Sequence, residues 1–139
     1  MTGLTINQIE TGQSASFGKT ITETDVYMFA GISGDHNPAH VNEEYAKEGL
    51  FKGRIAHGML GASLISTVLG MKLPGPGTIY LKQELKFLAP VRFGDTICAT
   101  CTVKEKIEDK NRLVLDCVVV NQEGTQVIVG EAVVMPPKA

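Results

Sequence analysis

The segment Gly58–Met71 constrains the fold more than any other part of the sequence, because it is apolar on every side of a predicted helix. Its large apolar residues recur at helical spacing, and no charged residue interrupts them. A helix without a polar face is expected to be buried all round. It would be ~21 Å long at 1.5 Å per residue, and the Pro- and Gly-rich residues 73–77 end it. The rest of the chain must therefore fold around this helix.

Strand candidates supply the cover that such a helix needs. Residues 14–20 form a short polar candidate before the helical half of the chain. Four longer candidates follow the apolar helix, separated by turn-like residues. They are residues 79–88, 95–107, 112–121 and 126–135. The sequence predicts an α+β fold in which an antiparallel sheet of about five strands wraps around the central buried helix.

Residues 113–120 are apolar on both alternating faces of their predicted strand. An antiparallel sheet normally keeps one face in contact with water. The buried helix accounts for cover on one face, so a second copy of the chain is the expected cover for the rest. The sequence therefore predicts a homodimer.

Composition excludes several classes of function. A chain of 139 residues is the length of one domain, residues 1–139. Its 13 Lys and Arg against 15 Asp and Glu give a net charge of −2 with no basic stripe, so we expect no nucleic-acid partner. No signal peptide is expected at the N-terminus. The longest uncharged stretch, residues 55–71, is shorter than the ~20 apolar residues of a membrane span.

The three cysteines do not suggest a disulfide framework and fit a reducing cytoplasm. Cys98 and Cys101 form a C-x-x-C pair, but they lie on a strand candidate. Residues three apart on a strand face opposite sides, so these two thiols cannot jointly bind a metal. We expect no metal and no redox cofactor, and we interpret the cysteines as small core residues.

Two short helices are predicted around an Asn-Pro turn. Residues 22–34 show helical spacing, with Thr22 and Asp25 as a capping box. Pro38 cannot continue that helix, because proline lacks the backbone N–H and disfavours helical geometry in the residue before it. Residues 42–47 predict a second helix capped by Asn42.

The loop between these helices carries the residues best suited to catalysis, Asp35 and His40. A carboxylate and an imidazole five residues apart, positioned by a turn, can both hydrogen-bond to one water molecule and transfer a proton in either direction. This is general acid–base chemistry, in which histidine is the commonest participant because its unperturbed pKa lies near neutrality. The alternative is that Asp35 only caps the turn through an Asx motif and that His40 packs on the surface.

This segment resembles the hydratase signature of the MaoC-like dehydratases, the type-2 or (R)-specific enoyl-CoA hydratases. That signature is an aromatic residue, then Ser-Gly-Asp-x-Asn-Pro-x-His, and a small residue six positions on. The corresponding residues here are Phe29, Ser33, Gly34, Asp35, Asn37, Pro38, His40 and Ala46. Residues 55–60, 84–91, 94–95 and 130–132 also resemble the family, so the likeness covers most of the chain.

The resemblance implies a hot-dog dimer that adds water to a trans-2-enoyl-CoA to give an (R)-3-hydroxyacyl-CoA, or catalyses the reverse dehydration. Acyl-CoA would be the substrate, and no cofactor would be needed. Asp35 and His40 would hold and activate the water, and the backbone N–H of Gly58 would bind the thioester carbonyl. A helix start suits that role, because its free N–H groups and dipole favour an oxyanion.

Other residues have either a role in the site or a structural alternative. Ser66 resembles a family serine that supports the site, or it is a helical serine bonded to the preceding turn. His57 either lines the pocket or is structural, Asn37 supports the site, and His36 is incidental. Four cations near the pocket mouth either meet the phosphates of coenzyme A or are solvated surface charges: Lys52, Arg54, Lys82 and Lys86.

Three other functions remain open at this point. One is a dehydratase of another 3-hydroxyacyl thioester, including one carried on acyl carrier protein. A second is a hot-dog thioesterase, which is disfavoured because residues 58–71 contain no Asp or Glu. The third is a non-catalytic acyl-CoA-binding module, which is disfavoured because both Asp35 and His40 are present.

Overall fold

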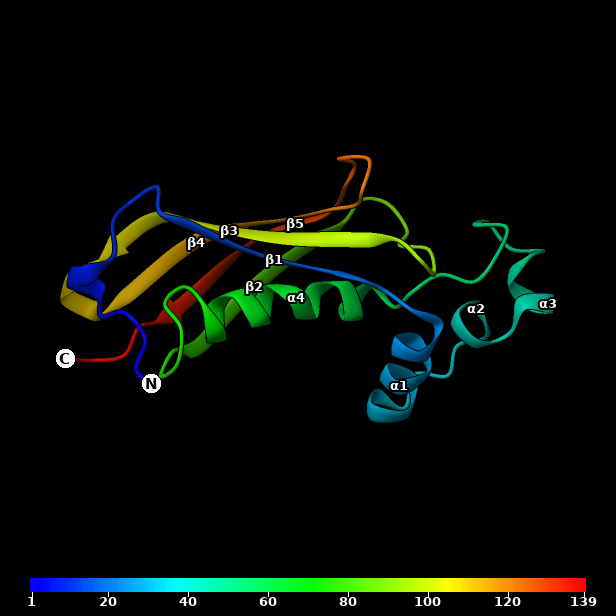
Figure 1. Cartoon of the computed structure of the whole chain (residues 1–139), viewed down its shortest axis with the longest axis horizontal. Coiled ribbons are helices and arrows are strands. Elements are labelled where there is room, and N and C mark those ends of the chain that lie inside the picture. The colour runs from blue at the N-terminus through cyan, green and yellow to red at the C-terminus, as the bar shows by residue number, and fades with distance from the viewer.

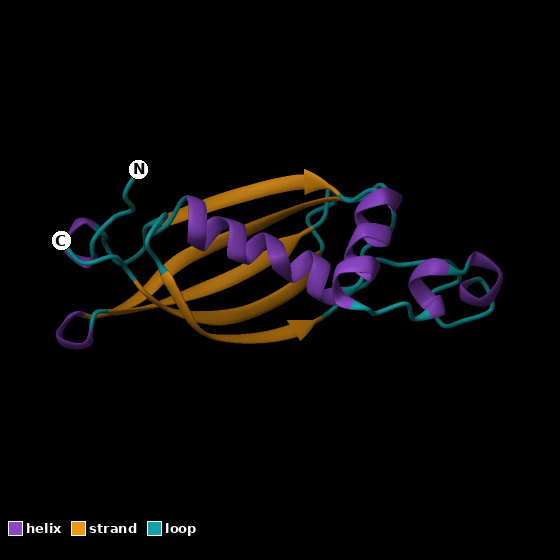
Figure 2. Ribbon diagram, turned by 90° about the horizontal axis from the view of Figure 1, so that it is seen from below, coloured by secondary structure: helices purple, strands orange, loops and turns teal.

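A five-stranded antiparallel sheet lies over one long helix in the computed structural model, which describes all residues from 1 to 139 (Figures 1 and 2). The strand order is β1-β3-β4-β5-β2. The strands are β1 (Ser14–Thr20), β2 (Ile79–Phe87), β3 (Thr96–Ile107), β4 (Arg112–Val120) and β5 (Gln126–Met135). The helices are α1 (Glu23–Ser33), α2 (Pro38–Val41), α3 (Glu43–Ala46) and α4 (Gly58–Met71), with 3-10 turns at Ile6–Gln8 and Glu108–Lys110. The predicted α+β hot-dog fold is confirmed.

Helix α4 runs across the sheet and packs against β1, β3 and β4. Leu64, Ile65 and Val68 are buried on the face that meets the sheet. The expectation that α4 is covered on every side is wrong for a single chain, because Met59 and Met71 are 57% and 65% exposed. The reason is geometric: one sheet can cover only one face of a helix.

Strand β2 forms one edge of the sheet and pairs only with β5. Its apolar side chains are largely exposed to solvent. Ile79, Leu81 and Phe87 are 51%, 45% and 52% exposed, and Leu88 just beyond the strand is 53% exposed. Exposed apolar side chains on an unpaired edge strand are typical of an interaction site.

Helices α1 to α3 (residues 23–46, the helical arm) extend past the end of the sheet, on the opposite side from both termini (Figure 1). The predicted capping box is present, since Thr22 Oγ1 accepts from Asp25 N at 3.1 Å and Asp25 Oδ2 accepts from Thr22 N at 2.9 Å. Gly34 ends α1 with a left-handed φ of 80°, which glycine adopts without a steric penalty.

One helix of the arm was not anticipated from the sequence. The residues after Gly34 were expected to be a loop, but Pro38 begins α2. Proline suits the first helical position, because its missing N–H would have no intrahelical acceptor there. The predicted helix over residues 42–47 is confirmed in shorter form as α3, with the Asn42 side chain accepting from Tyr45 N.

The cysteines occupy the places that the strand pattern predicted. Cys98 is partly buried, whereas Cys101 is fully buried on the opposite face of β3. Cys101 Sγ lies 3.7 Å from Cys117 Sγ on β4. This hydrogen bond and burial raise the pKa of the Cys101 thiol, which is typical of an unreactive core cysteine. None of the helices combines the length and the apolar character needed to cross a membrane.

Candidate active site

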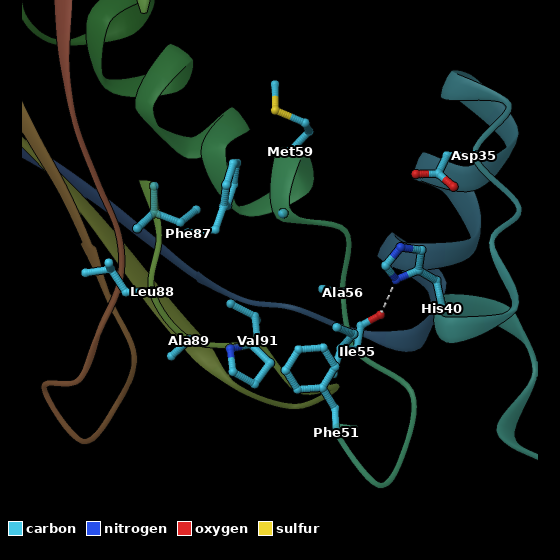
Figure 3. Close-up of a pocket in the computed structure, with 13 residues that line it drawn as sticks. Asp35, His40, Phe51, Ile55, Ala56, Met59, Phe87, Leu88, Ala89 and Val91 are labelled. Atoms are coloured by element: carbon cyan, nitrogen blue, oxygen red, sulfur yellow. Dashed lines mark hydrogen bonds between the residues drawn. The ribbon is translucent and has the colours of Figure 1, made fainter. Parts of the chain in front are cut away.

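A pocket of about 460 Å³ lies where the helical arm, the start of α4 and the end of β2 meet. Figure 3 shows Asp35 and His40 on the arm, across from the apolar side chains of the sheet side. Gly58 lines the same pocket. The apolar lining includes Phe51, Ile55, Met59, Phe87, Leu88, Ala89 and Val91. An apolar cavity with a few convergent polar groups is the usual form of a small-molecule site.

Local hydrogen bonds hold the Asp35 carboxylate in place. Asp35 N donates to Ser33 Oγ at 3.1 Å, and Ser33 Oγ donates to Phe29 O at 2.7 Å. The Asn37 N–H donates to Asp35 Oδ1 at 3.2 Å. The Asx turn that was the alternative role for Asp35 is therefore present. It occupies one carboxylate oxygen and leaves Oδ2 available to the pocket.

His40 is carried by the short helix α2, whose first turn Asn37 caps by accepting from Ala39 N at 3.0 Å. His40 Nδ1 lies 2.8 Å from the carbonyl oxygen of Ile55, as the dashed line in Figure 3 shows. A carbonyl oxygen only accepts, so Nδ1 carries the proton and neutral His40 presents a bare Nε2. Asn37, which was expected to support the site, is the N-cap of the helix that carries His40.

His57 lies beside this pair. One donor or acceptor atom from each of Asp35, His40 and His57 falls within 4.8 Å of the others. The two imidazoles stack, with ring centroids 3.8 Å apart and planes at 28°. Each ring also has one nitrogen bonded to a main-chain carbonyl. Each ring therefore keeps one nitrogen free of main-chain bonds, Nε2 in His40 and Nδ1 in His57.

Gly58 is the first residue of α4, where backbone N–H groups have no intrahelical acceptor. His57 occupies the N-cap position but makes no side-chain capping bond, so it leaves those donors free. A Cβ on residue 58 would lie 2.7 Å from the Phe87 ring. Glycine is therefore the residue that fits between the helix start and Phe87.

The structure does not bring Ser66 to the same pocket. Ser66 lies two turns along α4 and lines a second cavity of about 410 Å³ with Ser63 and Tyr80. Its hydroxyl makes no hydrogen bond within the chain, unlike Ser63, which donates to Leu60 O at 2.5 Å. Met59 lines both cavities and stands between them.

Arg54 is engaged within the chain. Its guanidinium donates to Glu23 at 2.7 Å, to Glu43 at 3.1 Å and to the Tyr27 hydroxyl at 2.7 Å. The hydrogen bonds to Glu23 and Glu43 raise the pKa of Arg54, that to Glu23 most of all. Arg54 therefore ties α1 and α3 to the segment that precedes α4. Lys82 pairs with Glu84 at 3.2 Å, whereas Lys52 and Lys86 make no ion pair.

Two contributors to the site were missed in the sequence. The Ile55 carbonyl fixes the His40 tautomer, but a main-chain group leaves no signal in residue identity. Phe87 contacts Gly58, and it lies in a family-like segment, residues 84–91, that had not been connected with the pocket.

Comparison with known proteins gives consistent matches to one family. The MaoC-like domain matches residues 5–125. The chain is 57% identical to the (R)-specific enoyl-CoA hydratase of Rhodospirillum rubrum, over 93% of this chain and 89% of that protein. It is 43% identical to the 3-hydroxybutyryl-CoA dehydratase of Methylorubrum extorquens, over 97% and 85% respectively. The solved structure of R-hydratase PhaJ1 from Pseudomonas aeruginosa superposes with a TM-score of 0.93 at 45% identity, covering 99% of this chain and 88% of that one.

Proposed function

The chain belongs to the MaoC-like domain family, and we propose that it is an (R)-specific enoyl-CoA hydratase with Asp35 and His40 as its catalytic pair. It adds water to trans-2-enoyl-CoA to give (R)-3-hydroxyacyl-CoA and catalyses the reverse dehydration. The observation that carries the proposal is the Asp35 carboxylate and the bare Nε2 of His40 in one pocket with the Gly58 N–H.

The two acceptors suit a nucleophilic water. A water that donates one hydrogen to Asp35 and the other to His40 Nε2 keeps an oxygen lone pair directed at the substrate. As the new bond to C3 forms, Asp35 takes a proton from this water, and the electrons of the C2–C3 double bond move onto the thioester carbonyl. The same pair then returns a proton to C2, which completes the addition. Positioned proton transfer of this kind contributes about 100- to 10,000-fold in rate.

Gly58 supplies the electrostatic part of the reaction. The negative charge that develops on the thioester oxygen meets a free N–H at the positive end of α4. The uncapped first turn of α4 supports this role. The apolar side chains opposite Asp35 and His40 suit the acyl group.

No step of this addition is a redox step, and none requires a Lewis acid, so we propose that it proceeds without a metal or a redox cofactor. Dialysis against a strong chelator is expected to leave the hydration rate unchanged. A loss of rate that zinc restores would contradict this part of the proposal.

The three cysteines form no disulfide, which fits the cytoplasmic location that we propose.

We also propose that the enzyme is a homodimer. The open apolar edge of β2 and the exposed face of α4 support a homodimer, as do exposed arm residues such as Ile32, which is 80% exposed. Such an interface buries at least ~2,000 Å² in obligate dimers. Sedimentation equilibrium at micromolar concentration should give twice the chain mass of 14.9 kDa; the mass of one chain would contradict the dimer.

The activity is tested by following the loss of enoyl-thioester absorbance for CoA substrates with acyl chains of four to twelve carbons. Chiral analysis of the product is expected to give the (R) alcohol. Matched thioesters on acyl carrier protein form a parallel series, and faster turnover of that series would favour the carrier-protein dehydratase instead. Binding of acyl-CoA without turnover would favour the non-catalytic module.

A further inference from the structure

We infer that His57 is a positioning residue that fixes the geometry of Asp35 and His40. This inference rests on the proposed function, since it concerns the same pocket. Three features of His57 carry it: the hydrogen bond to the Asp35 backbone, the stack on the His40 ring, and the place at the start of α4.

His57 is the only charged or polar residue among the buried residues of the chain, at 3% exposure. Its Nε2 lies 2.9 Å from the main-chain carbonyl oxygen of Asp35. A carbonyl oxygen cannot donate, so Nε2 carries the proton and Nδ1 is bare. Nδ1 has neither a hydrogen-bond partner nor solvent contact. The ring is therefore held by one directional bond, and that bond ends on the backbone of the catalytic aspartate.

A purely space-filling role accounts poorly for this arrangement. An apolar side chain would occupy the same volume without leaving a buried nitrogen unpaired, and unpaired buried polar groups are rare because they cost stability. The hydrogen bond from His57 Nε2 to the Asp35 carbonyl offsets part of this cost and joins residues 22 positions apart in the chain. It links the N-terminus of α4 to the loop that carries the Asp35 carboxylate.

The ring of His57 also sets the plane of the His40 ring. His57 lies 3.8 Å from His40 in a stacked arrangement and 4.8 Å from Phe29 in a tilted one. The bond to Ile55 fixes the position of His40 Nδ1 but still allows the ring to tilt about it. Stacking removes that tilt, so the His40 Nε2 lone pair keeps one direction. Phe29, the aromatic residue of the signature, also contacts the His57 ring.

His57 stands at the N-cap of α4 without capping it. Residues with short polar side chains, such as Ser or Asp, are preferred at this position because they bond to the N–H groups of the first turn. The His57 side chain bonds instead to the Asp35 loop. His57 thereby leaves the backbone N–H groups at the start of α4 without a side-chain cap, and it orients Asp35 and His40.

Two substitutions separate the two contacts. His57→Gln keeps a donor for the Asp35 carbonyl but loses the ring stack, whereas His57→Phe keeps a stacking ring but loses the donor. His36→Gln and His36→Phe are the matched controls, because His36 is exposed and its side chain makes no hydrogen bond. Thermal midpoints of all four variants establish whether each one is folded.

Steady-state kinetics with trans-2-butenoyl-CoA give the first readout. Each folded His57 variant is expected to lose about 10- to 100-fold in kcat, as supporting residues that orient reactive groups typically do, while KM stays within about threefold. The His36 controls keep the wild-type kcat. Folded His57 variants whose kcat lies within twofold of wild type would overturn the inference.

Nitrogen-15 spectra of the imidazole groups give a second readout that a merely structural role would not move. The wild-type protein should show His57 protonated at Nε2 and His40 protonated at Nδ1. In His57→Gln, the Ile55 carbonyl should keep His40 protonated at Nδ1, whereas the His40 Nε2 signal should shift because the ring is free to tilt. Wild-type His57 protonated at Nδ1 would overturn the inference without any variant, so unfolded variants leave the test intact. A wild-type protein without hydratase activity would refute the proposed function alone, because the tautomers are measured independently.

Discussion

Gly58→Ala is expected to damage catalysis while leaving the fold intact. The added Cβ would lie 2.7 Å from the Phe87 ring, and carbon atoms need about 3.5 Å or more. The ring must therefore move by about 1 Å. It can do so at little cost in stability, because Phe87 is 52% exposed on an edge strand. Alanine also favours a helix over glycine by up to about 1 kcal/mol.

The displaced ring remains in the pocket where the substrate carbonyl must approach the Gly58 N–H. A misplacement of about 1 Å costs on the order of 100-fold in rate, comparable to the loss of an oxyanion donor. We therefore expect kcat/KM to fall by about 100-fold and the thermal midpoint to stay within a few degrees of wild type. The assay is hydration of trans-2-butenoyl-CoA, with midpoints from calorimetry.

Gly70→Ala is the matched control, because Gly70 lies on the same helix and its added Cβ would meet nothing within 4 Å. It should keep the wild-type rate. The double variant Gly58→Ala/Phe87→Ala should recover part of the lost rate, since the clash is gone. Full activity in Gly58→Ala would refute the reasoning, and so would a loss of rate that persists unchanged in the double variant.

Two further predictions concern the helical arm. Arg54→Met removes two ion pairs, to carboxylates that are about half exposed, and the contact of the guanidinium with the Phe93 ring. We expect the free energy of unfolding, measured by denaturant titration, to fall by about 1–2 kcal/mol. Arg112→Met is the control and should cost less, because it removes only hydrogen bonds to neighbouring main-chain carbonyls. The hydrogen bond from the Thr22 backbone N–H, and Lys19 to a smaller extent, lower the pKa of Asp25 in the folded chain. The ionised Asp25 carboxylate therefore stabilises the fold above the unfolded pKa of about 3.9, and this stabilisation is lost as the pH falls through the folded value. Asp25→Asn should therefore lower the thermal midpoint at pH 7, and this difference should shrink below about pH 4; a difference that stays constant down to pH 2.5 would contradict the assignment.

The sequence predicted the elements whose signals are local. The bounds of α4 follow from an apolar run that proline ends, and the Thr22–Asp25 capping box follows from spacing alone. Helix α2 was missed because Pro38 was interpreted only as a helix breaker. Proline also suits the first position of a helix, which is where Pro38 lies.

The candidate site was predictable in part for a similar reason. Asp35 and His40 lie five residues apart, so a turn brings them together and their pairing is visible in the sequence. His57 contacts them from a distant segment, and nothing local indicates that its side chain would turn away from α4. Ser66 shows the converse, since its resemblance to a family serine suggested the catalytic pocket, but Ser66 lines a neighbouring cavity.

The most direct test of the account is the hydration rate of Asp35→Asn, measured beside His40→Ala and the double variant. Asparagine can still accept the Asn37 N–H that Asp35 Oδ1 accepts, so the turn and the thermal midpoint should persist while the base is lost. Each single change should lower kcat by about 100- to 10,000-fold. The double variant should be little worse than the worse single one, because residues that act on the same water are not additive. Near-wild-type turnover in Asp35→Asn would contradict the central claim that this carboxylate activates the water.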